Sequence, residues 1–154
     1  MNFRFATSED CGKIMFFIKE LAEYEKMSDL VVATEEDIRR ELFDKKCAET
    51  IFALDDNGTE VGFALFFTTF STFLGKSGIH LEDLYVLPER RGEGFGKGLL
   101  LALKEIARER KCGRLEWTCL DWNTPSLDFY KSLGAEIMDE WVMLRLSGET
   151  LEND

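Results

Sequence analysis

The residues that point most directly to chemistry form a short glycine-rich run, Arg91-Gly92-Glu93-Gly94-Phe95-Gly96. The run follows an apolar strand-like segment, residues 79–87, and precedes an amphipathic helical pattern. Glycines at a strand-to-helix turn allow several backbone N–H groups to converge on one anion at the positive end of the helix. The run therefore predicts a main-chain binding site for a phosphate-bearing ligand.

Three phosphate-loop patterns compete for this run. A Walker loop requires Ser or Thr after Gly-Lys, but Gly98 follows Gly96-Lys97. A dinucleotide loop requires glycine where Lys97 stands, in the first unit of a doubly wound domain. The third pattern, [Q/R]-x-x-G-x-[G/A], is met by Arg91, Gly94 and Gly96, and it is the favoured interpretation. A glycine-rich turn with no ligand is the structural alternative.

The elements that must position this loop can be placed from local patterns. Capping-box spacings at Thr7/Asp10 and at Thr34/Asp37 predict two helix starts, and apolar residues at helical spacing extend the first helix to about Tyr24. Apolar and β-branched runs bounded by turn residues predict strands. These strands cover residues 2–6, 50–54, 61–70, 79–87, 115–120 and 141–146.

Two further helices are expected, one from the glycine loop to Gly113 and one from Asn123 to Gly134. The resulting order is β-α-α-β-β-β-α-β-α-β. A strand meander followed by β-α-β crossovers predicts an α/β fold with a mixed sheet and helices on both faces. Residues 1–154 are expected to form a single domain, with 147–154 as a loose tail.

Composition limits the partners and the compartment. The formal net charge is −11, which disfavours nucleic acid. Such a surface would attract a cationic small molecule, but an acidic surface that only keeps the protein soluble is the favoured interpretation. No apolar run approaches the ~20 residues needed to cross a bilayer, and the amino terminus lacks a signal-peptide pattern. The four cysteines show no metal-type spacing, so no metal is expected, and reduced thiols in the cytoplasm are the default.

Three segments together resemble a known family. They are residues 81–86 (LEDLYV), residues 91–96 (RGEGFG) and residues 122–135 (WNTPSLDFYKSLGA). This combination is similar to the GNAT N-acetyltransferase superfamily. Residues 17–25 (FIKELAEYE) and the W-N-x-P-S-x-x-F-Y-K spacing resemble its spermidine/spermine and thialysine acetyltransferase branch. The resemblance covers nearly the whole chain.

The resemblance implies acetyl-coenzyme A as the donor and a primary amine as the acceptor, with direct transfer in a ternary complex. The acceptor would be a small di- or polyamine or a lysine-like amino acid, and the enzyme would be a homodimer. The loop amides would hold the pyrophosphate and a strand edge would pair with the pantetheine arm. The implied cofactor-binding residues are Leu84, Tyr85, Val86, Arg91, Gly92, Glu93, Gly94, Phe95, Gly96, Lys97, Asn123 and Ser126.

The resemblance assigns catalysis to two residues. The hydroxyl of Tyr130 would protonate the departing thiolate, although helical spacing alone favours a core tyrosine. Glu82 would accept the proton of the substrate ammonium; a surface carboxylate at a sheet edge is the alternative. Glu82 and Asp83 are adjacent, so they should point to opposite faces unless a bulge intervenes.

The amine site is implied to include Tyr24, Glu25, Glu82 and Trp141, whereas His80 is expected to have a structural or surface role. Two other functions stay open at this point. One is a protein or peptide N-acetyltransferase, and the other is a non-catalytic acyl-coenzyme A-binding module.

Overall fold

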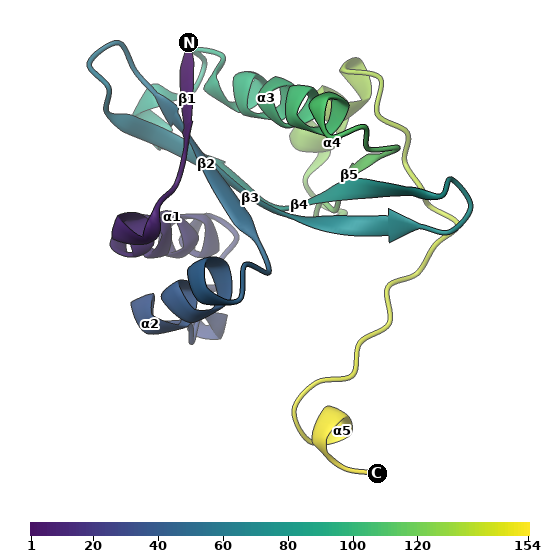
Figure 1. Ribbon diagram of the computed structural model, residues 1–154. Coiled ribbons are helices and arrows are strands. Elements are labelled where there is room, and N and C mark those ends of the chain that lie inside the picture. Colours follow the sequence, from purple (N-terminus) through teal and green to yellow (C-terminus); the bar gives the residue numbers. More distant parts are fainter. The chain divides into compact units, whose positions relative to one another are not determined.

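A computed structural model describes residues 1–154, which form two compact units, Met1–Thr118 and Cys119–Asp154 (Figure 1). The first unit contains one five-stranded sheet in the order β1-β2-β3-β4-β5. The first three pairings are antiparallel and the pairing of β4 with β5 is parallel. The predicted mixed α/β class is confirmed. The strands are β1 (Asn2–Phe5), β2 (Glu49–Leu54), β3 (Glu60–Ser71), β4 (Lys76–Val86) and β5 (Leu115–Trp117).

The helices begin where capping signals predict them. Thr7 and Thr34 each form a complete capping box, and the first long helix ends at Tyr24. The first unit contains α1 (Cys11–Tyr24), α2 (Glu35–Ile38), α3 (Phe95–Glu109), the short helical turns η1 (Ser8–Asp10), η2 (Ser28–Leu30) and η4 (Pro88–Arg90), and the π-helical turn η3 (Arg39–Asp44). The second unit contains α4 (Thr124–Ser132) and α5 (Glu149–Glu152).

Helices cover both faces of the sheet (Figure 1). On the α1 face, the Phe17 ring stacks on Phe63 with centroids 5.2 Å apart, and both side chains are fully buried. On the α3 face, Leu99 and Leu103 are fully buried. A Cβ on Gly62 would lie 2.8 Å from a backbone oxygen of β4, so only glycine allows this close approach. Successive side chains of β3 point to opposite faces of the sheet, and each β4 residue points to the same face as its β3 partner. The register of this pair therefore determines which β4 side chains face α1.

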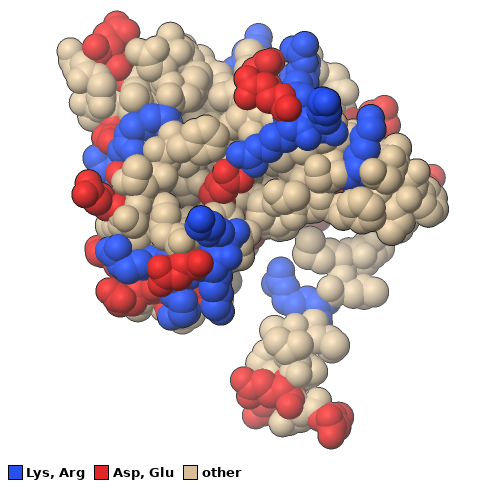
Figure 2. Space-filling view, viewed as in Figure 1, with Lys and Arg blue, Asp and Glu red and all other residues tan.

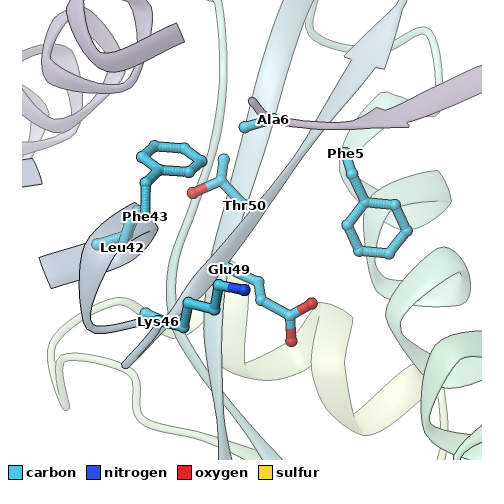
Figure 3. A pocket seen from close by; sticks show the side chains of 8 residues that line it. Phe5, Ala6, Leu42, Phe43, Lys46, Glu49 and Thr50 are labelled. Carbon is cyan, nitrogen blue, oxygen red and sulfur yellow. The ribbon is translucent and has the colours of Figure 1, made fainter. Parts of the chain in front are cut away.

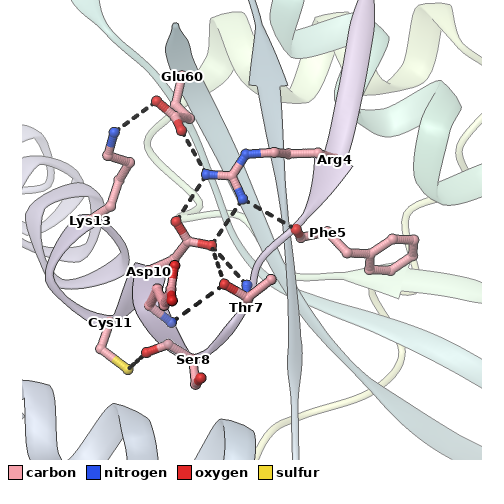
Figure 4. Close-up of polar contacts among 9 residues, drawn as sticks. Arg4, Phe5, Thr7, Ser8, Asp10, Cys11, Lys13 and Glu60 are labelled. Atoms are coloured by element: carbon pink, nitrogen blue, oxygen red, sulfur yellow. Dashed lines mark hydrogen bonds and ion pairs between the residues drawn. The ribbon is translucent and has the colours of Figure 1, made fainter. Parts of the chain in front are cut away.

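A charged network ties β1 to α1 and β3 (Figure 4). The Arg4 guanidinium hydrogen-bonds both carboxylate oxygens of Asp10 at 2.9 Å and also Glu60 at 2.6 Å, and Lys13 completes the network at 2.7 Å from Glu60. The hydrogen bond from Arg4 lowers the pKa of Asp10 to about 2. Burial alone would raise the pKa of Glu60, but the hydrogen bonds from Lys13 and Arg4 outweigh it and lower this pKa to about 2 as well.

The element order differs from the prediction at the carboxyl end. The final strand predicted over residues 141–146 is absent, and that segment has no regular secondary structure. Its apolar run carries β-propensity, but a strand also requires backbone pairing, which a local sequence pattern does not specify. The expected tail carries one helical turn, α5, and β5 is shorter than predicted. The helices of the structure are too short or too polar to span a membrane.

Candidate active site

The glycine loop joins β4 to α3 through two left-handed residues, Gly92 with φ of 83° and Gly94 with φ of 90°. Gly94 is the N-cap of α3, and no side chain caps this helix end. The first backbone N–H groups of α3, from Phe95 onward, are therefore available to an anion. This geometry agrees with the loop that the spacing of Arg91, Gly94 and Gly96 predicts.

Arg90 organises the acidic side of the loop, which the sequence did not reveal. Its guanidinium pairs with Glu93 at 2.9 Å and with Asp55 of the β2–β3 turn at 2.9 Å, and it lies over the Phe95 ring at 5.3 Å. The hydrogen bond from Arg90 holds the pKa of Glu93 below its usual range. The negative charge of Glu93 is thus compensated beside a loop that is suited to bind an anion.

The strand before the loop has an open edge. β4 pairs with β5 only through Ile79, His80 and Leu81. Beyond Leu81, β4 continues to Val86 with β3 as its one strand partner. The main-chain groups of Leu84–Val86 that face away from β3 therefore lack a strand partner, so this edge can pair with an extended amide-bearing ligand.

A β-bulge lies at Glu82. Leu81 pairs with Phe66 and Asp83 pairs with Leu65, so Glu82 is the extra residue on β4. The shift turns Asp83 to the face of Leu65, which belongs to the core cluster under α1. Regular alternation would separate Glu82 and Asp83, and the bulge is what changes their directions.

The bulge creates a carboxylate cluster. The pKa of Asp83 is raised to about 6, mainly by burial and in addition by the negative charges of Glu82 and Glu25. Burial also raises the pKa of Glu25, which follows the last residue of α1. The Glu82 carboxylate lies 3.7 Å from Nε2 of His80. Asp83 and His80 were not predicted as site residues; the only sequence signal was the pair of adjacent carboxylates.

Four predicted site residues lie in the second unit. Asn123 is the N-cap of α4, and its side-chain oxygen accepts a hydrogen bond from the Ser126 N–H at 3.4 Å. Tyr130 lies on α4 against Phe129, with ring centroids 5.6 Å apart. Trp141 lies in the extended segment after α4. Their meeting with Glu82 and the loop stays a prediction.

A separate pocket of about 290 Å³ opens near the end of β1 (Figure 3). None of the predicted site residues lines it. Its lining residues are Phe5, Ala6, Leu42, Phe43, Lys46, Ala48, Glu49 and Thr50. The structure contains no cluster of His, Cys, Asp or Glu side chains that could hold a metal ion.

The sequence matches the Acetyltransferase (GNAT) family over residues 16–135, a segment that contains the loop, the bulged strand and α4. The chain belongs to the GNAT family. This acetyltransferase is 38% identical to thialysine N-epsilon-acetyltransferase of Bos taurus, over 96% of its own chain and 93% of the relative. It is 30% identical to an L-ornithine N5-acetyltransferase of Arabidopsis thaliana, over 97% and 85% of the two chains.

A solved structure shares the fold over nearly the whole chain. An integron cassette protein from the mobile metagenome of V. cholerae superposes with a TM-score of 0.81 and is 27% identical. The match covers 98% of this acetyltransferase and 94% of that protein. The resemblance to the GNAT superfamily and to its thialysine branch is therefore confirmed, and the chain is an enzyme rather than a non-catalytic module.

Gly94 should be more important for cofactor binding than for folding. A Cβ there would meet only Met1 Cε at 3.7 Å, so Gly94→Ala adds backbone strain at positive φ rather than a clash. We expect Gly94→Ala to cost about 1 kcal/mol of unfolding free energy, and to weaken coenzyme A binding about 10-fold by reorienting the loop amides. Isothermal titration calorimetry and urea unfolding measure the two effects.

Gly58→Ala is the matched control, because Gly58 has φ of 78° in the β2–β3 turn and open space around its Cβ position. It should lower stability by a similar amount and leave coenzyme A affinity unchanged. Equal coenzyme A affinities for Gly94→Ala and the wild type would contradict the loop assignment.

Asp83 should destabilise the fold at neutral pH. Its folded pKa of about 6 exceeds its ordinary value, so the folded state binds more protons, and stability falls as pH rises from about 4 to 6. Asp83→Asn should therefore raise the free energy of unfolding by about 2 kcal/mol at pH 8 and remove this pH dependence. Urea unfolding across this pH range measures it. Asp56→Asn, in an exposed turn, is the control and should have little effect; a less stable Asp83→Asn would refute the argument.

Proposed function

We propose that this enzyme transfers the acetyl group of acetyl-coenzyme A to the side-chain amine of a lysine-like amino acid or a small diamine. Relatives that match nearly the whole chain support this acceptor class. Thialysine and ornithine, which give two of these relatives their names, are small amino acids with a terminal side-chain amine.

The loop and the open strand edge would form the cofactor half of the site. Backbone amides from Gly92 to Lys97 would hold the pyrophosphate at the start of α3, and Arg91, whose N–H donates to the Pro88 carbonyl at 3.3 Å, would contribute its side chain. The free edge of Leu84–Val86 would pair with the pantetheine arm, and Asn123 and Ser126 would add contacts. Two adjacent sets of main-chain groups support this arrangement: the uncapped N–H groups of the loop, and the edge of β4 that has no second strand partner.

The carboxylate cluster at the bulge is the observation that carries the acceptor assignment. Glu82, Asp83 and Glu25 place negative charge where β4 loses its β5 partner. A cationic amine would be attracted to these groups and would lower the pKa of Asp83, which burial and then the charges of Glu82 and Glu25 raise. Tyr24 and Trp141 would complete the walls of the amine site.

Glu82 and Tyr130 would carry out the proton transfers of the reaction. An alkylammonium has a pKa of about 10.4, so Glu82 would accept its proton, directly or through water, before the nitrogen attacks. Acetyl-coenzyme A supplies the acetyl thioester. Main-chain N–H groups of Leu84–Val86 would stabilise the developing negative charge on the carbonyl oxygen, and Tyr130 would donate its proton to the departing sulfur as the C–S bond breaks. The nitrogen would then lose its second proton, which restores the Tyr130 hydroxyl directly or through water.

We infer that residues 1–154 act as one GNAT domain, in a cytoplasmic homodimer that binds neither nucleic acid nor membrane. The net charge of −11 supports the exclusion of nucleic acid. On the face seen in Figure 2, Lys and Arg side chains are interspersed with Asp and Glu and form no broad basic field.

A thiol-release assay with acetyl-coenzyme A tests the function. Thialysine, lysine, ornithine, spermidine, an aminoglycoside and a lysine-containing peptide would serve as acceptors. The proposal expects the highest kcat/KM with the small side-chain amines. Turnover of the peptide alone would replace it with the protein-acetyltransferase function, and no turnover with any small amine would refute it.

A further inference from the structure

Arg91 of the glycine loop lies against two tyrosine rings. Its Cζ lies 5.1 Å from the centroid of the Tyr24 ring and 5.2 Å from that of the Tyr85 ring. The two rings are themselves in edge-to-face contact, with centroids 6.5 Å apart. The Nε of Arg91 donates a hydrogen bond to the Val86 carbonyl at 3.1 Å. The guanidinium is therefore fixed by α1, by β4 and by the strand end that precedes the loop.

The two tyrosines are positioned by different means. Tyr85 is 5% exposed within the core under α1, and its hydroxyl donates to Glu20 of α1 at 3.4 Å. Tyr24 is the last residue of α1 and is 46% exposed. A guanidinium over an aromatic face is attracted by the ring quadrupole, and planar stacking leaves its edge free for hydrogen bonds.

The edge of Arg91 is not used inside the protein. Its terminal nitrogens make no hydrogen bond within the chain, whereas Arg90 next to it uses its guanidinium on Glu93 and Asp55. Arg91 is also the first residue of the loop whose amides suit an anion. A guanidinium pre-oriented on two rings loses little entropy when it binds a phosphate.

We propose that Tyr24 and Tyr85 are positioning residues for the cofactor: they hold Arg91 so that its terminal nitrogens meet the pyrophosphate of coenzyme A. This inference rests on the proposed binding of coenzyme A at the loop. Under this proposal Tyr24 contributes to donor binding in addition to any contact with the amine. The carboxyl end of α1, which contributes to the proposed amine site, would then also contribute to the donor site.

Calorimetric titration with coenzyme A tests the proposal on the wild type, Tyr24→Leu, Tyr24→Phe, Arg91→Met and the double variant Tyr24→Leu/Arg91→Met. Tyr24→Leu should weaken binding about 2- to 5-fold, the effect of one exposed cation–π contact. Tyr24→Phe keeps the ring and should restore the wild-type affinity. Arg91→Met should weaken binding at least about 10-fold, as expected for a lost hydrogen bond to a charged group.

The double variant and a truncated donor test whether Tyr24 acts on cofactor binding through Arg91 or whether its loss disturbs the enzyme in general. In the Arg91→Met background, Tyr24→Leu should cause no further loss of affinity. With acetyl-pantetheine, which lacks the pyrophosphate, Tyr24→Leu should lower kcat/KM about 2- to 5-fold less than it does with acetyl-coenzyme A, because any loss through the amine site is common to both donors. Equal losses in both backgrounds, or equal losses with both donors, would overturn the proposal. Failure of the wild type to bind coenzyme A would instead refute the proposed function.

Discussion

Glu82→Gln should lower kcat/KM for the amine by about 100-fold at pH 7, because a positioned general base typically contributes 10²- to 10⁴-fold. The amide keeps the size and polarity of the side chain but cannot accept the ammonium proton. The remaining rate would depend on the small fraction of amine that is already neutral at pH 7. Steady-state thiol release with the best acceptor of the panel measures the effect.

The pH profile of this variant gives a second readout. Wild-type kcat/KM should rise through about pH 6 as Asp83 loses its proton and the cluster becomes fully negative. Because the charge of Glu82 helps to raise the pKa of Asp83, Glu82→Gln should move that midpoint below pH 6 and flatten the rise.

Glu116→Gln is the matched control, since Glu116 is an exposed carboxylate on β5 that pairs with His80 in the register. It should keep kcat/KM within about 2-fold of the wild type, as is usual for surface substitutions. A Glu82→Gln enzyme with the wild-type rate and pH profile would assign the base to another group.

Tyr130→Phe should lower kcat by about 100-fold, because the departing thiolate would lose its general acid. The phenylalanine ring preserves the packing against Phe129, so α4 should keep its structure. Coenzyme A affinity should stay within about 2-fold of the wild type, since the substitution removes no loop contact. Steady-state kinetics and calorimetry on the same preparation separate the two quantities.

Ser132→Ala removes another hydroxyl from the same helix, one that donates to the Phe129 carbonyl at 2.6 Å. It should leave kcat unchanged and so controls for a general effect on α4. If Tyr130→Phe retained the wild-type kcat, Tyr130 would have no part in the chemical step.

The elements that local signals specify were predictable from the sequence. The capping boxes at Thr7 and Thr34 each involve residues three positions apart, so a short segment contains the whole signal. The segment 141–146 shows the limit of such reasoning. Its apolar run fits a strand, yet strand formation depends on a partner edge elsewhere in the chain.

The candidate site likewise contains features that a local sequence pattern predicts and features that depend on residues far apart in the chain. The left-handed glycines of the loop, Gly92 and Gly94, follow from a local motif. The inward turn of Asp83 does not, because it results from the register in which β4 meets Leu65 and Phe66 of β3. The contact of Arg91 with the rings of Tyr24 and Tyr85 joins residues far apart in the sequence, and no spacing rule could have revealed it.

The free edge of β4 also affects how the enzyme should be handled. An unpaired strand edge is a template for association with another chain, and natural proteins protect such edges with charge, bulges or a bound partner. Here Asp83 supplies the charge, and the adjacent Glu82 forms the bulge. Coenzyme A would supply the third. Cofactor-free preparations should therefore aggregate more readily, above all at acidic pH, where Asp83 loses its charge.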